Sequence, residues 1–153
     1  MFRILFFILI ITLPFKAIAL IEVDITRGNL NPLPIAVSPL SIDENSRKSF
    51  EKVLKKKNIG SEISIVVEQN LRASGLFNPL NKDAFLQAPD IANLKPRFED
   101  WNLIKAQALI TGKVNFVDEK LRVEFRLWDV LAGKEMMALA FTTVPNNWRR
   151  VGH

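Results

Sequence analysis

The sequence has no cysteine and no tyrosine, and its only histidine is His153, the last residue. A chain without cysteine forms no disulfide, so packing alone must hold the domain together. Metal sites built on cysteine or histidine lack ligands here, and a nucleophile–histidine triad lacks its base. The six glycines are isolated from one another, which excludes a glycine-rich phosphate loop. We therefore expect no cofactor and no metal.

Carboxylates are the remaining source of catalytic chemistry. Adjacent acids occur at Asp43-Glu44, Glu99-Asp100 and Asp118-Glu119. Each pair falls at a predicted helix start or turn, where acids cap helices or face water. A hydrolase that uses two carboxylates needs a fold that brings two acids together. An enzyme with a buried carboxylate pair therefore stays open as the rival function.

The first 19 residues have the three-part layout of a secretory signal. Residues 1–3 form a basic start, residues 4–13 are apolar, and Ala17 and Ala19 occupy the two positions that a signal peptidase reads. The apolar run of about ten residues is half of the roughly 20 that span a bilayer. We predict cleavage after Ala19. An uncleaved membrane anchor is the alternative, which sequencing of the exported amino terminus would detect.

The expected mature chain, residues 20–153, has 134 residues, enough for one domain with a single core. Loss of Arg3 and Lys16 lowers the formal net charge from +5 to +3. A positive balance of this size favours solubility and does not indicate a nucleic-acid partner. No later apolar run reads as a membrane span, and no cysteine follows the cleavage site to carry a lipid. We therefore expect a soluble product without stable membrane insertion.

Apolar and polar residues alternate at the new amino terminus, a pattern typical of a half-exposed strand. A turn-rich break at residues 27–32 follows, and terminal strands carry few contacts. The strand either stays docked in its own sheet or adds to the open sheet edge of a partner. The candidate partner-binding residues are Leu20, Ile21, Glu22, Val23, Asp24, Ile25 and Thr26.

A short buried strand is predicted within residues 34–40, followed by a basic amphipathic helix within residues 43–58. This segment holds six lysines and arginines, with Phe50, Val53 and Leu54 on one helical face. The basic residues suit an anionic partner or, more simply, a solvated helix end that complements the helix dipole. The sequence assigns this lysine-rich segment no role.

Residues 61–74 show the clearest helical periodicity of the chain. Ser61 is the expected amino cap, and Gly75 stands where a left-handed terminating residue is required. Residues 81–97 are expected to be irregular, and residues 98–104 to form a short helix that places Phe98 and Trp101 on one side, in the core.

The last third predicts three strands at residues 109–117, 121–127 and 137–142, with turns at 118–119 and 132–133. Consecutive strands with short connections are antiparallel neighbours. The expected fold class is therefore α+β, a mixed sheet with a C-terminal three-stranded antiparallel meander and helices on one face.

Residues 147–153 begin a helical pattern that is too short to stand alone, since an isolated helix needs roughly 12 residues. Two interpretations follow: the tail frays, or the chain is the front part of a longer protein whose helix continues. The second agrees better with the helix signals that are present.

Several segments of the expected mature chain together match one known family in their order and spacing. The first is Ile21 to Asn29 with Pro34 to Val37. The later segments are Leu71-Arg72-Ala73-Ser74-Gly75-Leu76-Phe77, Phe98-Glu99-Asp100-Trp101, residues 106–112, Arg126-Leu127-Trp128-Asp129 and Asn147-Trp148-Arg149-Arg150-Val151. Together they resemble the TolB family of the Tol-Pal system of Gram-negative bacteria, and the first segment is similar to the opening of its mature members. The resemblance spans nearly all of residues 20–153.

The resemblance implies a periplasmic, non-catalytic protein with an α/β amino-terminal domain and a carboxy-terminal β-propeller. It implies that the segment at residues 20–26 binds the inner-membrane protein TolA. It also implies that the propeller binds the peptidoglycan-associated lipoprotein, and that the system supports outer-membrane integrity and constriction during cell division. The propeller is absent from this sequence, so lipoprotein binding is expected only where a propeller is supplied. A secreted domain that merely builds an assembly is a third possibility.

Overall fold

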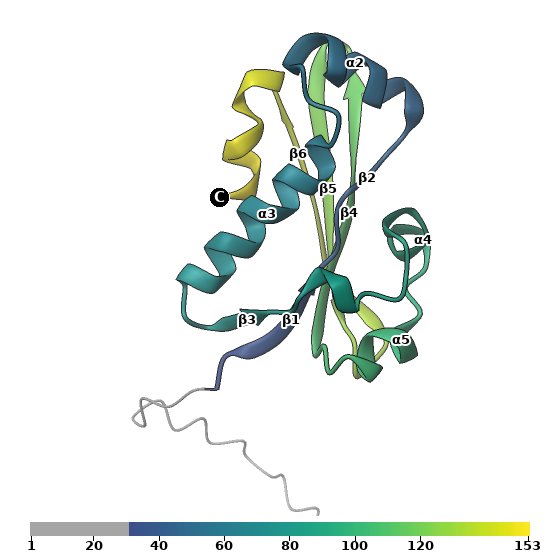
Figure 1. Cartoon of the computed structure of the whole chain (residues 1–153), viewed down its shortest axis with the longest axis vertical. Coiled ribbons are helices and arrows are strands. Elements are labelled where there is room, and N and C mark those ends of the chain that lie inside the picture. Colours follow the sequence, from purple (N-terminus) through teal and green to yellow (C-terminus); the bar gives the residue numbers. More distant parts are fainter. Residues whose placement is uncertain (1–30) are drawn as a thin grey trace, which may run out of the picture.

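The computed structural model of the chain describes residues 31–153 (Figure 1). The strands and helices alternate in the first half of this range, and three long strands follow in the second half. In chain order they are β1 Leu33–Val37, β2 Ser41–Ile42, α2 Glu44–Leu54, α3 Ile59–Ala73, β3 Phe77–Pro79, η1 Lys82–Ala84, α4 Pro89–Leu94, α5 Phe98–Leu103, β4 Ala108–Val117, β5 Lys120–Asp129, β6 Lys134–Thr143 and η2 Pro145–Gly152, where η marks a 3-10 helix.

One mixed sheet runs through the described residues in the order β3-β1-β4-β5-β6, and β2 pairs separately with β4. β1 is parallel to both β3 and β4, whereas β4, β5 and β6 are antiparallel. The predicted α+β class and its C-terminal meander are confirmed. The predicted turn at 118–119 is also confirmed, because Asp118 and Glu119 both adopt positive φ angles, 50° and 59°, as a two-residue hairpin turn requires.

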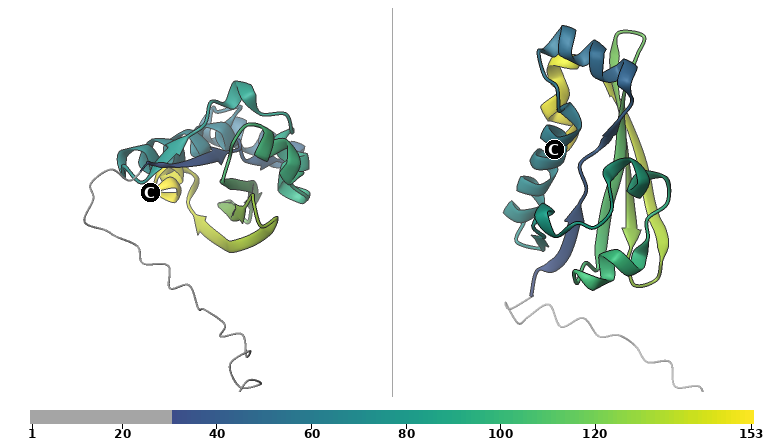
Figure 2. Two further views of the ribbon diagram at one scale, coloured as in Figure 1. Left: turned by 90° about the horizontal axis from the view of Figure 1, so that it is seen from below. Right: turned by 45° about the vertical axis from the view of Figure 1, so that its right-hand side comes forward.

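Two hydrophobic clusters hold the helices to the sheet. The first joins α2, α3 and η2 to the strands and includes Phe50, Ile63, Trp148 and Val123. The second joins α4 and α5 to the strands and includes Trp101. Leu109, in the second cluster, and Val114, in the first, lie an odd number of positions apart on β4, so the clusters lie on opposite faces. The longer helices form the expected layer on one face, and the two short helices add a smaller layer on the other (Figure 2).

Helix α3 begins two residues before the predicted amino cap, so the assignment of Ser61 as cap is wrong. Asn58 holds the cap position, and Ile59 and Gly60 are buried in the first turn. A Cβ built on Gly60 would come under 3.0 Å from the carbonyl oxygen of Leu40, whose backbone N–H donates to the Gly60 carbonyl at 3.3 Å. Tertiary packing against the β1–β2 connection therefore extends the helix. Its end agrees with the prediction, because Gly75 has a φ of 73°.

The expectation that residues 81–97 are irregular is wrong in part. The segment contains η1 and the six-residue helix α4, which starts at Pro89 and buries Ala92. Proline suits the first helical position because its missing N–H is not needed there. The short helix expected at residues 98–104 is confirmed as α5, with Trp101 buried.

Asp43 caps α2 and connects it to the sheet. Its carboxylate accepts hydrogen bonds from the Ser46 backbone N–H at 2.9 Å and from the Ser46 hydroxyl at 2.6 Å. The Ser46 hydroxyl oxygen also accepts from the backbone N–H of Phe116 on β4, at 2.8 Å. The Ser46 hydroxyl, and secondly its backbone N–H, hold the pKa of Asp43 below its ordinary value of 3.8.

We expect the Asp43→Ala variant to lose about 1 kcal/mol of unfolding free energy at neutral pH, the usual effect of removing an amino cap. Because the folded-state pKa is depressed, the stabilisation is present above the ordinary pKa and is lost as the pH falls through the folded-state pKa. Urea unfolding at neutral and acidic pH measures both effects. Asp90→Ala, in the first turn of α4, is the control and should stay within about 0.5 kcal/mol of wild type. If the difference in unfolding free energy between Asp43→Ala and wild type persists at acidic pH, this assignment is contradicted.

Candidate functional site

The residues singled out from the sequence as a partner-binding strand, Leu20 to Thr26, lie outside the described residues. The same holds for the predicted signal-peptidase positions Ala17 and Ala19. The partner-binding strand and the cleavage site therefore both stay predictions. The described residues instead present two neighbouring features that the sequence reasoning did not single out, an open sheet edge and an apolar groove.

The open edge is β6, which pairs with β5 alone among the described strands. No charged residue occurs from Met136 to Val144, and nearly all of the strand is exposed to solvent. Sheet edges are usually protected by charges, prolines or a covering element, because unpaired backbone groups invite another strand. β6 lacks charges and proline along this stretch, so it is chemically suited to contact with further polypeptide.

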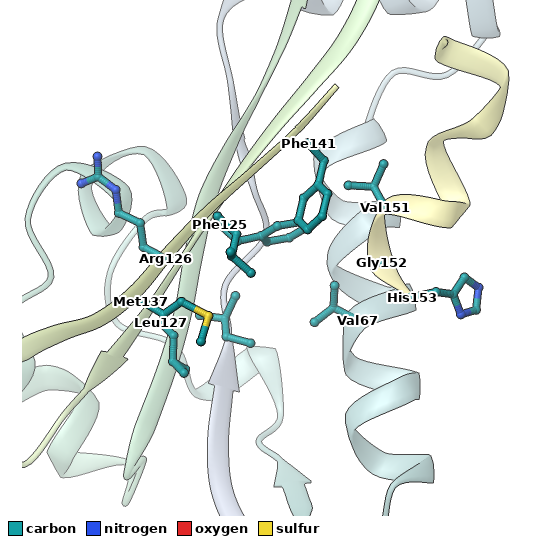
Figure 3. A pocket seen from close by; sticks show the side chains of 11 residues that line it. Val67, Phe125, Arg126, Leu127, Met137, Phe141, Val151, Gly152 and His153 are labelled. Carbon is teal, nitrogen blue, oxygen red and sulfur yellow. The ribbon is translucent and has the colours of Figure 1, made fainter. Parts of the chain in front are cut away.

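The apolar groove lies between the inner face of the meander and the helical layer formed by α3 and η2 (Figure 3). Met137, Leu139 and Phe141 on β6 point to one face, as predicted, and stand opposite Leu127, Phe125 and Val123 on β5. They are nevertheless 51%, 48% and 43% exposed, whereas Val123 is fully buried. The groove is lined by Val67, Ile110, Phe125, Arg126, Leu127, Met137, Leu139, Phe141, Val151, Gly152 and His153.

Aromatic and aliphatic side chains dominate the groove. Phe125 and Phe141 meet edge to face with ring centroids 6.1 Å apart. In Figure 3 the side chain of Arg126 points away from these apolar groups, and the ring of His153 lies at the outer rim. A groove of this kind binds an apolar surface by excluding water.

The C-terminal segment forms one wall of the groove and is held firmly in place. Trp148 is only 6% exposed, with Lys56 at 5.2 Å and Arg149 at 4.6 Å from its ring centroid. The side-chain amide of Asn70 on α3 donates to the carbonyl oxygen of Gly152 at 2.7 Å. Residues 145–152 are therefore packed against α3 and the sheet. They form a 3-10 helix, with non-helical angles at Asn147, where the sequence predicted the start of an α-helix.

The three acid pairs lie apart from this groove and serve local structure. Asp43 caps α2, and Asp100 forms an ion pair with Arg97 at 2.6 Å. Asp118 and Glu119 form the exposed hairpin turn. None of the six acids is buried, so they do not provide the buried carboxylate pair that the enzymatic alternative requires.

Residues 31–153 contain neither a metal-binding cluster nor a helix suited to crossing a membrane. In this range no three histidine, cysteine, aspartate or glutamate side chains gather closely enough to hold a metal ion. No helix of the described range has the length and apolar character needed to cross a membrane.

The mixed sheet, its meander and the two helical layers define an α+β domain. Its open edge strand β6 and its apolar groove are suited to contacts with other polypeptide. Residues 21–136 match the TolB amino-terminal domain, and the chain belongs to this family. It is 82% identical over 147 residues to the Tol-Pal system protein TolB of Pelagibacter ubique, strain HTCC1062. The match covers 96% of this chain but 33% of that relative, so the chain spans about a third of the length of the relative.

Solved structures support the fold. TolB from Acinetobacter baumannii superposes with a TM-score of 0.58 at 19% identity, over 80% of this chain and 26% of that one. An NMR structure of LpoB from E. coli superposes with a TM-score of 0.50 at 7% identity, over 73% of this chain and 56% of that one. At these identities the likeness concerns the fold alone. The resemblance to the TolB family that the sequence indicated is confirmed by the family match and by the Pelagibacter relative.

Proposed function

We propose that this chain is a non-catalytic component of the Tol-Pal system that works in the periplasm and binds a TolA-like inner-membrane protein. The binding element is the segment from Leu20 to Thr26. The observation that carries the proposal is membership of the TolB amino-terminal domain family, with a match that begins at Ile21 and so includes all of this segment except Leu20. In this role the chain supports outer-membrane integrity and constriction during cell division.

The alternating pattern of the segment supports binding by strand addition. Main-chain hydrogen bonds to an open sheet edge supply affinity, and alternate side chains entering pockets supply specificity. Ile21, Val23 and Ile25 are the side chains that would enter such pockets, and Glu22 and Asp24 would face water. The peptidoglycan-associated lipoprotein is a further partner only in a protein that also carries a propeller.

The expected mature chain without residues 20–26 should keep its fold and lose capture of a TolA domain in a pull-down. A Val23→Asp variant should weaken capture at least tenfold, because a charge would enter an apolar pocket. The Thr26→Asp variant adds the same charge on the polar face and serves as the matched control. Circular dichroism checks that each protein is folded. Unchanged capture by the truncated chain would exclude the segment as the binding element.

The apolar groove has a separate role in this proposal. We further propose that in a protein as long as the Pelagibacter relative, about three times the length of this chain, a helix continuing from η2 runs along the groove and covers it. Two contacts support this assignment: Val151 and His153 line the groove, so the chain leaves η2 at its edge, and Asn70 holds η2 at Gly152. The domain then serves as a rigid holder between the partner-binding segment and the remainder of the protein.

A further inference from the structure

The end of the domain at which α2 lies carries a concentration of positive charge. Residues 43–58 hold six lysines and arginines against three carboxylates, and η2 adds Arg149 and Arg150. Lys56 and Arg149 both approach Trp148, which brings the two groups of cations together. In Figure 1, α2 lies across the tip of the molecule at which β4 ends.

Local ion pairs leave part of this charge free. Arg47 and Lys48 share the single carboxylate of Glu44, at 3.8 and 3.9 Å. Lys57 pairs with Glu51 and Lys56 with Glu62. Within residues 31–153, no carboxylate lies within 4.0 Å of the ammonium groups of Lys52 and Lys55 or of the guanidinium of Arg150. The tip therefore carries positive charges that the carboxylates of residues 31–153 do not neutralise.

Exposed apolar side chains lie among these cations. Val53 was predicted to share an apolar face of the helix with Phe50, but it is 50% exposed, whereas Phe50 is buried. Val53 lines a hollow together with Ser49, Lys52, Phe116, Glu119 and Pro145. Val117 and Val144 adjoin Phe116 and Pro145 in the chain, and they are 47% and 53% exposed. A surface that combines lysines with protruding aliphatic groups matches a lipid interface, where the charges meet anionic headgroups and the aliphatic groups enter the boundary of the bilayer.

We propose that this basic tip, defined as α2 with residues 55–58 and the adjoining η2, binds the surface of a membrane that contains anionic lipid. Five lysines and three arginines are spread over the 11-residue helix, the residues just after it and η2. This distribution suits a layer of many headgroups better than one shaped anion. Each cation near an anionic surface contributes roughly 1 kcal/mol. Asp118 and Glu119 lie at the same tip and limit the attraction, so we expect weak binding that salt reverses.

The test uses the expected mature chain, residues 20–153, with vesicles of phosphatidylglycerol and phosphatidylcholine, and with phosphatidylcholine alone. We expect co-sedimentation with the anionic vesicles only, and loss of binding at high salt. The Lys52→Glu/Lys55→Glu double variant should lower the partition coefficient roughly tenfold or more. No preference of wild type for anionic vesicles, or no effect of the double variant, would overturn the proposal.

A matched control lies at the other end of the sheet. Lys105 precedes β4 and Lys134 begins β6, and Lys105 shares the left-handed backbone of Lys55, with φ angles of 65° and 54°. The Lys105→Glu/Lys134→Glu variant changes the net charge equally and should bind vesicles as wild type does. If both double variants lose the same amount of vesicle binding, net charge alone drives the association, and the proposal is contradicted.

An acidic protein is the competing partner, and Val53 distinguishes it from lipid. We expect Val53→Asn to weaken vesicle binding several-fold, because asparagine lacks the favourable free energy that valine gains when it leaves water. Binding to soluble polyglutamate should be weaker than binding to anionic vesicles and should not change in this variant. Unchanged vesicle binding by Val53→Asn, together with tight binding of polyglutamate, would assign the tip to an acidic protein and reject the lipid surface.

Discussion

Replacing Trp101 with alanine is expected to lower the free energy of unfolding by about 3–5 kcal/mol. Trp101 is 1% exposed and belongs to the cluster that holds α4 and α5 to the sheet. Its ring meets Phe85 edge to face at a centroid distance of 5.0 Å. The substitution leaves a cavity that the two short helices, each of six residues, are too small to close by themselves. Urea unfolding monitored by circular dichroism measures this loss of unfolding free energy.

The Trp101→Phe variant separates packing from hydrogen bonding. The indole N–H donates to the side-chain oxygen of Gln87 at 3.0 Å, and this buried oxygen also accepts from the Arg97 backbone N–H at 3.0 Å. Because the second donor remains, loss of the indole N–H should cost only about 1 kcal/mol, with a smaller packing loss added. A loss under about 1 kcal/mol in Trp101→Ala would show that the cluster is not part of the cooperative core.

The sequence predicted well the elements whose residue pattern lies entirely within their own stretch of the chain. The strands of the meander alternate over about ten residues each, and their turns contain residues suited to positive φ. Helix α3 repeats its apolar residues over about four turns, and the left-handed residue Gly75 follows its end. In these segments the burial pattern, the backbone preference and the connection length all point to the same structure, so periodicity was sufficient.

The elements that the sequence missed depend on distant partners. β3 has only three residues, and its strand character comes from parallel pairing with β1, more than 40 positions earlier. The first turn of α3 depends on Gly60 approaching Leu40, which no local pattern encodes. Helix α4 begins at Pro89 and ends before Pro96, two prolines that favour irregular structure, and burial of Ala92 stabilises it. Short elements of this kind follow from tertiary packing, which outweighs local propensity.

The groove was missed for a different reason. The alternation of Met137, Leu139 and Phe141 is the same whether the strand face is covered or open, so the sequence correctly predicted which side chains share a face and not that the face is half exposed. Only the three-dimensional position of η2 beside α3 reveals that the helical layer stops short of β6. The pattern of residues 20–26 has the same ambiguity between a docked and a detached strand.

Extending the chain along the groove should raise its stability substantially. We expect residues 20–153 joined to the stretch that follows in the 82% identical relative to gain about 2–4 kcal/mol of unfolding free energy. The reason is that Met137, Leu139 and Phe141 would exchange roughly half of their exposed surface for contact with a continuing helix. Ordering of the added residues opposes part of the gain, which keeps the estimate below the value for full burial.

A charge placed in the groove tests whether the gain arises there. Leu139→Asp should change the stability of the short chain by less than about 1 kcal/mol, since this side chain is already half in water. In the extended chain the same substitution should remove most of the gain, because the new carboxylate would be buried without a partner. Ala138→Asp, on the opposite face of β6, introduces the same charge and should leave the gain intact. If the extension adds no stability, or if both variants respond alike, the helix does not cover the groove, and β6 is free to contact another chain.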